Sequence, residues 1–232
     1  MNALLTLSVD ACFDLICPWC LIGKQHLDTA IAQFAHERPD VAVNVEWQSY
    51  PLIPATPSAG LPYRDFYLAR LGSPEAVKAP QAQVCAAAQE AGLTLALDRI
   101  ETFPSTVLAH RLVRFARQQA GAQAASALIG NLFSRYFLRA ENIGNPHVLR
   151  QAVEECGIPT PGRAGDPVHH DLDWLPPLRD TQDPPLRPGL GVPHFVFNGT
   201  HSVSGSRPPA MLLEGMRQAL ARAKQRATRA AA

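Results

Sequence analysis

The chain has 232 residues, a formal net charge of +1 and a hydrophobic fraction of 47%. This length suits one large domain, or one domain that carries an insertion, and the apolar fraction is sufficient for a sizeable core. A net charge this close to zero gives no electrostatic footprint for nucleic acid or for an anionic membrane surface, so we expect neither as a partner.

The first fifty residues predict a strand, a helix and a second strand. Residues 4–13 contain no Gly or Pro and alternate loosely, which indicates a buried strand. A Cys-Pro-Trp-Cys motif at residues 17–20 follows, and apolar residues then recur at helical spacing to about His36. The alternation of residues 41–47 indicates the second strand. The motif therefore lies where a strand meets a helix N-terminus, with Pro18 near the first helical position.

From residue 61 to residue 157 the pattern is helical throughout. Nine prolines between Pro159 and Pro193 then rule out a continuous helix, and we expect residues 158–190 to form an irregular, mobile surface segment with little core. Asn198-Gly199 between two β-rich runs predicts a hairpin, and an amphipathic helix follows it. The two ends of the chain thus read β-α-β and β-β-α.

The N-terminus predicts a cytoplasmic location. No Lys or Arg precedes its apolar stretch, and Asp10 and Asp14 come before any small-residue cleavage site, which is unlike a signal peptide. No run approaches the roughly 18 apolar residues of a transmembrane helix. In the cytoplasm a Cys-x-x-Cys motif is more often catalytic or metal-binding than structural.

Three interpretations of Cys17 and Cys20 compete: a zinc site, a packed pair of thiols, and a redox pair. A structural zinc site needs four ligands. The candidates to complete one stand at no recognised spacing, and we predict no metal; they are Cys12, His26, His194 and His169-His170. Packing as small apolar residues suits the other cysteines, which are Cys12, Cys85 and Cys156.

The redox interpretation explains the position of the pair. The first turn of a helix has unpaired N–H groups and a partial positive charge, which stabilise a thiolate at Cys17. Cys20 follows by nearly one turn, so it lies on the same face and within disulfide reach. Pro18 and Trp19 between them influence how well the thiolate is stabilised.

The sequence resembles the FrnE-like branch of the DsbA family, which are thioredoxin-fold thiol–disulfide oxidoreductases with a helical insertion. Four stretches carry the resemblance and together cover most of the chain: SVDACFDLICPWCLIGKQHLDTA, YRDFYLARLGSPEAVKA, STVLAHRLVRFA and GVPHFVFNGTHSVSGSRPPAMLLEGM. It implies an α/β, thioredoxin-like fold with a large all-helical insertion. The expected division is a discontinuous thioredoxin-like domain at 1–60 and 187–232, a helical insertion at 61–157 and a proline-rich irregular connection at 158–186.

The resemblance also implies roles for single residues. Cys17 is expected to be the exposed nucleophile and Cys20 the resolving thiol. Pro193 is expected to be a cis-proline that faces the pair, with Val192 offering its backbone to an extended substrate. His194 follows where an apolar or small residue is more usual; it either tunes the Cys17 thiolate or, as we expect, is exposed at the strand start.

The predicted function is thiol–disulfide exchange with protein, peptide or glutathione substrates, and Pro18, Trp19, Val192 and His194 are the candidate substrate-binding residues. No cofactor is expected, with glutathione as a candidate redox partner. One alternative is a glutathione-dependent isomerase or transferase of the kappa type. Those relatives generally carry serine at the position of Cys17 and lack Cys20. The other alternative is a non-catalytic interaction module on the same fold.

Overall fold

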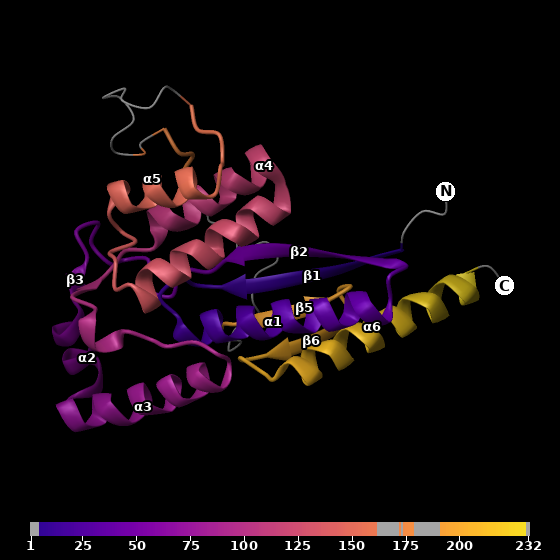
Figure 1. Ribbon diagram of the computed structural model, residues 1–232, viewed down its shortest axis with the longest axis horizontal. Coiled ribbons are helices and arrows are strands. Elements are labelled where there is room, and N and C mark those ends of the chain that lie inside the picture. The colour runs from indigo at the N-terminus through magenta and orange to yellow at the C-terminus, as the bar shows by residue number, and fades with distance from the viewer. Residues whose placement is uncertain (1–4, 162–171, 173, 179–190, 231–232) are drawn as a thin grey trace. The chain divides into compact units, whose positions relative to one another are not determined.

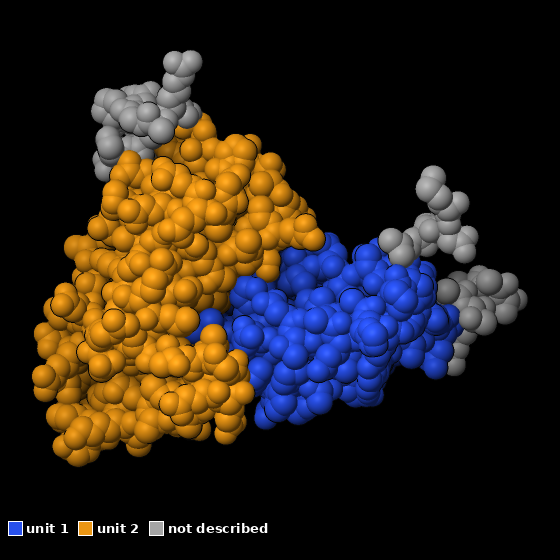
Figure 2. Space-filling model, in the orientation of Figure 1, with its two compact units in different colours: residues 1–13, 19–50, 182–232 blue, residues 14–18, 51–181 orange. Residues whose placement is uncertain are grey.

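The structure, a computed structural model, describes residues 5–161, 172, 174–178 and 191–230, with the backbone alone for 227–230. The chain divides into two units, which Figure 2 colours separately. Unit 1 comprises residues 1–13, 19–50 and 182–232. Unit 2 comprises residues 14–18 and 51–181.

A four-stranded sheet forms the centre of unit 1 (Figure 1). Its strands are β1 (Leu5–Phe13), β2 (Val41–Ser49), β5 (His194–Phe197) and β6 (His201–Ser204), in the spatial order β2-β1-β5-β6. β1 pairs in parallel with β2 and antiparallel with β5, and β5 pairs antiparallel with β6. The predicted β-α-β and hairpin patterns at the two ends of the chain are confirmed.

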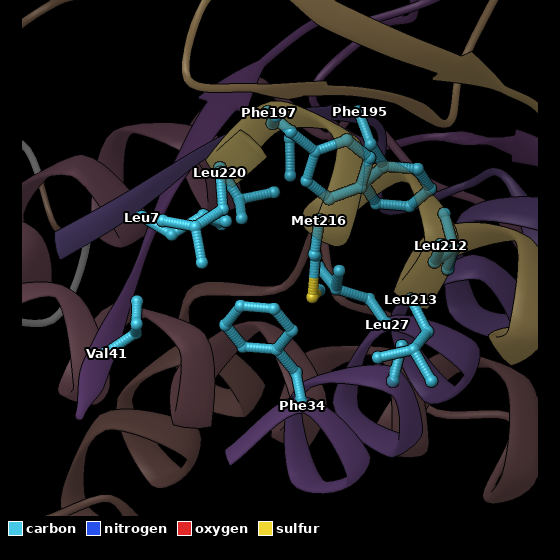
Figure 3. Close-up of a cluster of buried hydrophobic side chains, with 14 residues drawn as sticks. Leu7, Leu27, Phe34, Val41, Phe195, Phe197, Leu212, Leu213, Met216 and Leu220 are labelled. Carbon is cyan, nitrogen blue, oxygen red and sulfur yellow. The ribbon is translucent and has the colours of Figure 1, made fainter. Parts of the chain in front are cut away.

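The helices α1 (Pro18–Glu37) and α6 (Pro209–Ala230) contribute to one hydrophobic cluster with this sheet. Side chains at every second position of a strand share a face, and on β1 these are Leu7, Val9 and Ala11. Figure 3 shows them with aromatic rings of β5 and apolar side chains of both helices. The labelled members are Leu7, Leu27, Phe34, Val41, Phe195, Phe197, Leu212, Leu213, Met216 and Leu220.

The turn between β5 and β6 has the conformation that its sequence predicts. Asn198 and Gly199 have φ values of 47° and 61°, the left-handed conformation that these two residue types favour in tight turns, and Thr200 completes the loop between the paired residues Phe197 and His201. The side-chain oxygen of Asn198 also accepts a hydrogen bond from the backbone N–H of Ser8 at 2.8 Å. This hydrogen bond joins the hairpin turn to Ser8 of β1.

Unit 2 is predominantly helical. Its α-helices are α2 (Tyr63–Leu71), α3 (Pro74–Glu90), α4 (Val107–Phe133) and α5 (Pro146–Glu155), and a π-helical turn at Ser134–Leu138 follows α4. Ser73 and Asn145 cap α3 and α5 through their side chains, each directly before a proline at the first helical position. Among the residues that the structure describes, every helix is too short or too polar to cross a lipid bilayer.

The expectation of an all-helical block needs one correction. β3 (Leu61–Pro62) pairs antiparallel with β4 (Thr102–Phe103), so unit 2 contains a two-stranded ribbon among its helices. A strand of two residues contains no repeated position of the period-two pattern, and hydrophobic periodicity therefore gives no signal for it.

The proline-rich connection also departs from expectation where the structure describes it. Leu172 and Leu175 are buried, so this segment does contribute to a core. Arg111 and Arg114 of α4 donate hydrogen bonds to the backbone carbonyls of residues 175–177. The rest of the segment, and with it the predicted mobility and His169-His170, lies outside the described residues.

Two methionines of α6 provide a matched test of the cluster in unit 1. Met216 is fully buried in it, whereas Met211 is 51% exposed. Met216→Ala should lower the free energy of unfolding by about 2–5 kcal/mol, because it leaves a cavity among the sheet and both helices. Met211→Ala should stay within about 0.5 kcal/mol of wild type. Urea denaturation measures both, and equal effects would contradict this account of the core.

Candidate active site

The Cys-Pro-Trp-Cys motif follows directly from the end of β1. The backbone N–H of Cys17 donates to the carbonyl of Asp14 at 3.2 Å, closing a turn, and α1 begins at Pro18. Cys17 is therefore the residue immediately before the helix, and Cys20 lies in its first turn. This is the position that the sequence predicts.

The two cysteines differ little in accessibility. Cys17 is 7% exposed and Cys20 is 1% exposed. The expectation that Cys17 is exposed is therefore wrong for its side chain as a whole, although Cys17 keeps the larger exposed fraction. Leu15 and Ile16, which precede Cys17 in the turn, are also buried.

The helix N-terminus supplies the local electrostatics. Pro18 has no N–H, so the donors of the first turn that have no partner within the helix are the backbone N–H groups that follow it. α1, which is described along its whole length, has no acidic side chain in its first turn. The positive end of the helix dipole is thus not offset by a carboxylate on the same turn.

Pro193 packs on α1 close to the motif. The Val192–Pro193 peptide bond is cis, which confirms that prediction. A Cβ atom on Gly23 would lie 2.8 Å from the Cγ atom of Pro193, so the proline ring rests on the helix at this glycine. Gly23 is three residues after Cys20 and shares its helix face. Contact of Pro193 with the cysteine pair itself stays a prediction.

His194 is not exposed, contrary to expectation. Its side chain is buried, its Nδ1 atom lies 2.8 Å from the Ser204 hydroxyl on β6, and burial lowers the pKa of its imidazole. His194 is paired with Cys12 in the register of β1 and β5. Since Phe195 belongs to the cluster with α1, alternation along β5 places His194 on the opposite sheet face.

The other three cysteines have the surroundings of packed side chains. Cys12 is buried within β1, and burial raises the pKa of its thiol to about 11, with a further contribution from the charge of Asp10. Cys85 and Cys156 are half-buried on helices of unit 2. Burial also raises the pKa of Cys156. A protonated thiol is a poor nucleophile, so these positions fit the packing role predicted for them.

A buried hydrogen-bonded pair beside the motif was missed by the sequence analysis. Asp14 Oδ1 lies 2.9 Å from His110 Nε2, and both side chains are fully buried. The second carboxylate oxygen of Asp14 accepts a hydrogen bond from the backbone N–H of Leu52 at 2.6 Å. The available signals were a carboxylate in the apolar run DLIC and a histidine in the apolar helix VLAHRLV.

Three tyrosines of unit 2 belong to the same surroundings; Tyr63 and Tyr136 are buried and Tyr67 is half-buried. Burial raises the pKa of Tyr67, and the neighbouring Tyr63 and Cys17 raise it further. Burial likewise raises the pKa of Tyr136, with contributions from Tyr67, Tyr63 and Asp14. These phenols therefore remain protonated near neutral pH and contribute hydroxyl groups, not charges, around Asp14 and Cys17.

No group of three or more His, Cys, Asp or Glu side chains within the described ranges has an arrangement suited to a metal ion. The sheet also separates Cys12 and His194 from Cys20, and His169-His170 lies outside the described residues. Cys12 and His194 lie together on one face, whereas Cys20 is on the helix that covers the other face.

Comparison with solved structures supports the architecture. The structure of a probable DsbA oxidoreductase, SCO1869 from Streptomyces coelicolor, has a TM-score of 0.73 at 24% identity, with 93% of this chain and 90% of that chain covered. The cytosolic disulfide reductase DsbM from Pseudomonas aeruginosa, solved with GSH, has a TM-score of 0.53 at 16% identity, with 95% and 99% covered. At these identities the likeness concerns the fold.

Two sequence comparisons identify a relative and the family of this chain. The uncharacterized protein YwbO of Bacillus subtilis (strain 168) is 25% identical over 155 residues, which is 66% of this chain and 68% of that protein. Residues 8–165, more than half of the chain, match the family model of the DSBA-like thioredoxin domain. This span includes both cysteines of the motif and the Asp14–His110 pair. The chain belongs to the DSBA-like thioredoxin domain family.

Proposed function

We propose that this protein is a thiol–disulfide oxidoreductase in which Cys17 is the nucleophile and Cys20 the resolving thiol. The observation that carries the proposal is the location of the pair: a strand of the central sheet ends, a closed turn follows, and Cys17 stands at the N-terminus of α1. Family membership supports the same activity.

The proposed reaction has two displacement steps. The Cys17 thiolate attacks one sulfur of a substrate disulfide, which forms a mixed disulfide and releases one substrate thiolate. The Cys20 thiolate then attacks the Cys17 sulfur, which closes the Cys17–Cys20 disulfide and releases the second substrate thiolate. The substrate gains two electrons that the cysteine pair loses. The reverse sequence transfers a disulfide to a dithiol substrate.

Each residue near the pair receives a proposed role on the same basis. The first-turn N–H groups of α1 and the positive end of the helix dipole stabilise the Cys17 thiolate. Pro18 and Trp19 form the half-buried link between the two cysteines. Val192 offers backbone groups to an extended peptide by strand addition, beside Pro193. His194 has a buried hydrogen bond to β6 instead, and its contact with substrate stays a prediction.

The finer identification is also a proposal. We assign the chain to the FrnE-like branch of the family because its four matching stretches include both the motif and the Gly191-Val192-Pro193 segment. Glutathione is the proposed redox partner: two molecules of the thiol reduce the Cys17–Cys20 disulfide and leave as glutathione disulfide. The GSH named with the DsbM structure makes it the first compound to test.

Equilibration of the wild-type protein in glutathione buffers, followed by thiol trapping and mass measurement, tests the proposal. We expect one reversible intramolecular disulfide between Cys17 and Cys20. If this protein forms no such disulfide but catalyses a glutathione-dependent isomerisation, the kappa-type alternative would be favoured. The absence of any reactive thiol pair would favour a non-catalytic interaction module.

The two cysteines should respond differently to serine substitution. Cys17→Ser should abolish insulin reduction, because a serine hydroxyl stays protonated at neutral pH and does not attack disulfides. Cys20→Ser should still attack but should not release the substrate, so it accumulates a covalent adduct with one glutathione, measured by intact mass. Cys12→Ala serves as the control and should turn over like wild type. Full activity of Cys17→Ser would refute the assignment.

A pair of glycine substitutions tests the role of Pro193. Gly23→Ala adds a Cβ atom 2.8 Å from Pro193, whereas Gly215→Ala adds one 2.9 Å from the Phe197 ring, remote from the motif in sequence. Each overpacked contact should cost about 1–3 kcal/mol of stability. Only Gly23→Ala should also slow insulin reduction, since it displaces Pro193. Equal slowing by both variants would remove Pro193 from the proposed site.

A further inference from the structure

The exchange steps leave one fully buried titratable pair of unit 2 unexplained. Asp14 and His110 are 96 positions apart in sequence, and their side chains meet at 2.9 Å with no exposure of either. Burial of a carboxylate is costly unless it is paired and hydrogen-bonded. A buried pair of this kind holds in place the segments of the chain that contact it.

The contacts of Asp14 converge on the turn that carries Cys17. One carboxylate oxygen is held by His110 on α4 and the other by the N–H of Leu52 at 2.6 Å. The main-chain carbonyl of the same residue accepts the hydrogen bond from the N–H of Cys17 at 3.2 Å. A rigidly fixed Asp14 thus fixes the backbone of Cys17 through a single further bond.

We propose that Asp14 and His110 form a positioning pair that holds Cys17 at the N-terminus of α1 in the geometry needed for attack. This inference rests on the proposed function and adds two residues to that site without giving them a chemical step. Neither needs to touch the substrate. Their effect passes through the Asp14–Cys17 turn, where an error of about 1 Å in the position of a reacting atom can cost a hundredfold in rate.

Position and charge make opposite predictions for one substitution. Asp14→Asn retains an oxygen that accepts from Leu52, and its amide donates to His110 Nε2 once the imidazole takes the tautomer with its proton on Nδ1, but the negative charge is removed. If the pair acts by position, this variant recovers most of the reactivity of Cys17. If the carboxylate acts by repelling the thiolate, the same variant reacts faster than wild type.

The experiment measures the rate at which iodoacetamide modifies Cys17 in the reduced full-length protein at fixed pH, resolved by peptide mass. Asp14→Ala and His110→Phe, which break the pair from either side, should each slow modification about tenfold or more. Asp14→Asn should be close to wild type. The equilibrium constant with glutathione, measured on the same variants, should shift in parallel, because a merely structural role would not move it.

Leu132→Ala is the matched control. Leu132 is a fully buried residue of α4 that lies beyond the break in this helix at Gly121, so its truncation should lower thermal stability by a comparable amount without slowing modification of Cys17. Equal slowing by Leu132→Ala would show general destabilisation and would overturn the proposal.

Three further results would also overturn the proposal. The first is modification of Cys17 at the wild-type rate in both Asp14→Ala and His110→Phe. The second is faster modification in Asp14→Asn than in wild type. The third is failure of both disruptive variants to fold, which would make the pair structural. If Asp14→Ala alone does not fold, His110→Phe decides. A wild-type protein without a reactive Cys17 would instead refute the proposed function, and so the two failures are distinguishable.

Discussion

The parallel pairing of β1 with β2 is the constraint on which the proposed site depends. Two parallel strands cannot be joined by a tight turn, so the chain must cross back over the sheet, and here α1 is that crossover. The N-terminus of α1 must consequently lie at the carboxyl end of β1. Any residue placed in the short link between them, as Cys17 is, stands beside unpaired N–H groups.

The same constraint explains why glycine and proline occur where they do around the motif. α1 lies on the sheet, and close approach to the segment that enters β5 is allowed only because Gly23 has no side chain to meet Pro193. The sheet face beneath is filled by alternate residues of β1 and β5. Packing in unit 1 therefore supports the helix that carries Cys20 and holds Pro193 against it.

Unit 2 holds the turn that carries Cys17 through polar contacts. Its polar contacts to Asp14 fix the turn before α1, and desolvation raises the pKa values of Tyr67 and Tyr136 further above neutral pH, so both phenols stay uncharged. Replacement of a buried ion pair by apolar side chains is often tolerated or even stabilising in proteins. Stability alone therefore gives no reason for Asp14 and His110, whereas the location of Asp14, three residues before Cys17, does.

Much of the fold and the core of the site could be predicted because the signals are local. Alternation over residues 41–47, a proline after the capping residue Ser73, and Asn198-Gly199 between two β-rich runs each specify one element through its own backbone. The Cys-x-x-Cys spacing likewise places both thiols of the proposed redox pair at the start of α1. These features were read from neighbouring residues, and the structure retains them.

What only the tertiary structure decided depends on partners distant in the chain. The ribbon of β3 and β4 joins residues about forty positions apart, and two residues per strand give no periodic pattern. Leu172 is buried in a segment whose prolines suggested an exposed loop, and His194 faces away from α1 because of the register of β5. The hydrogen bond of Asp14 to His110 spans 96 positions. Local sequence determines which face of a helix or strand is apolar, and only the folded chain determines which distant residues pack against that face.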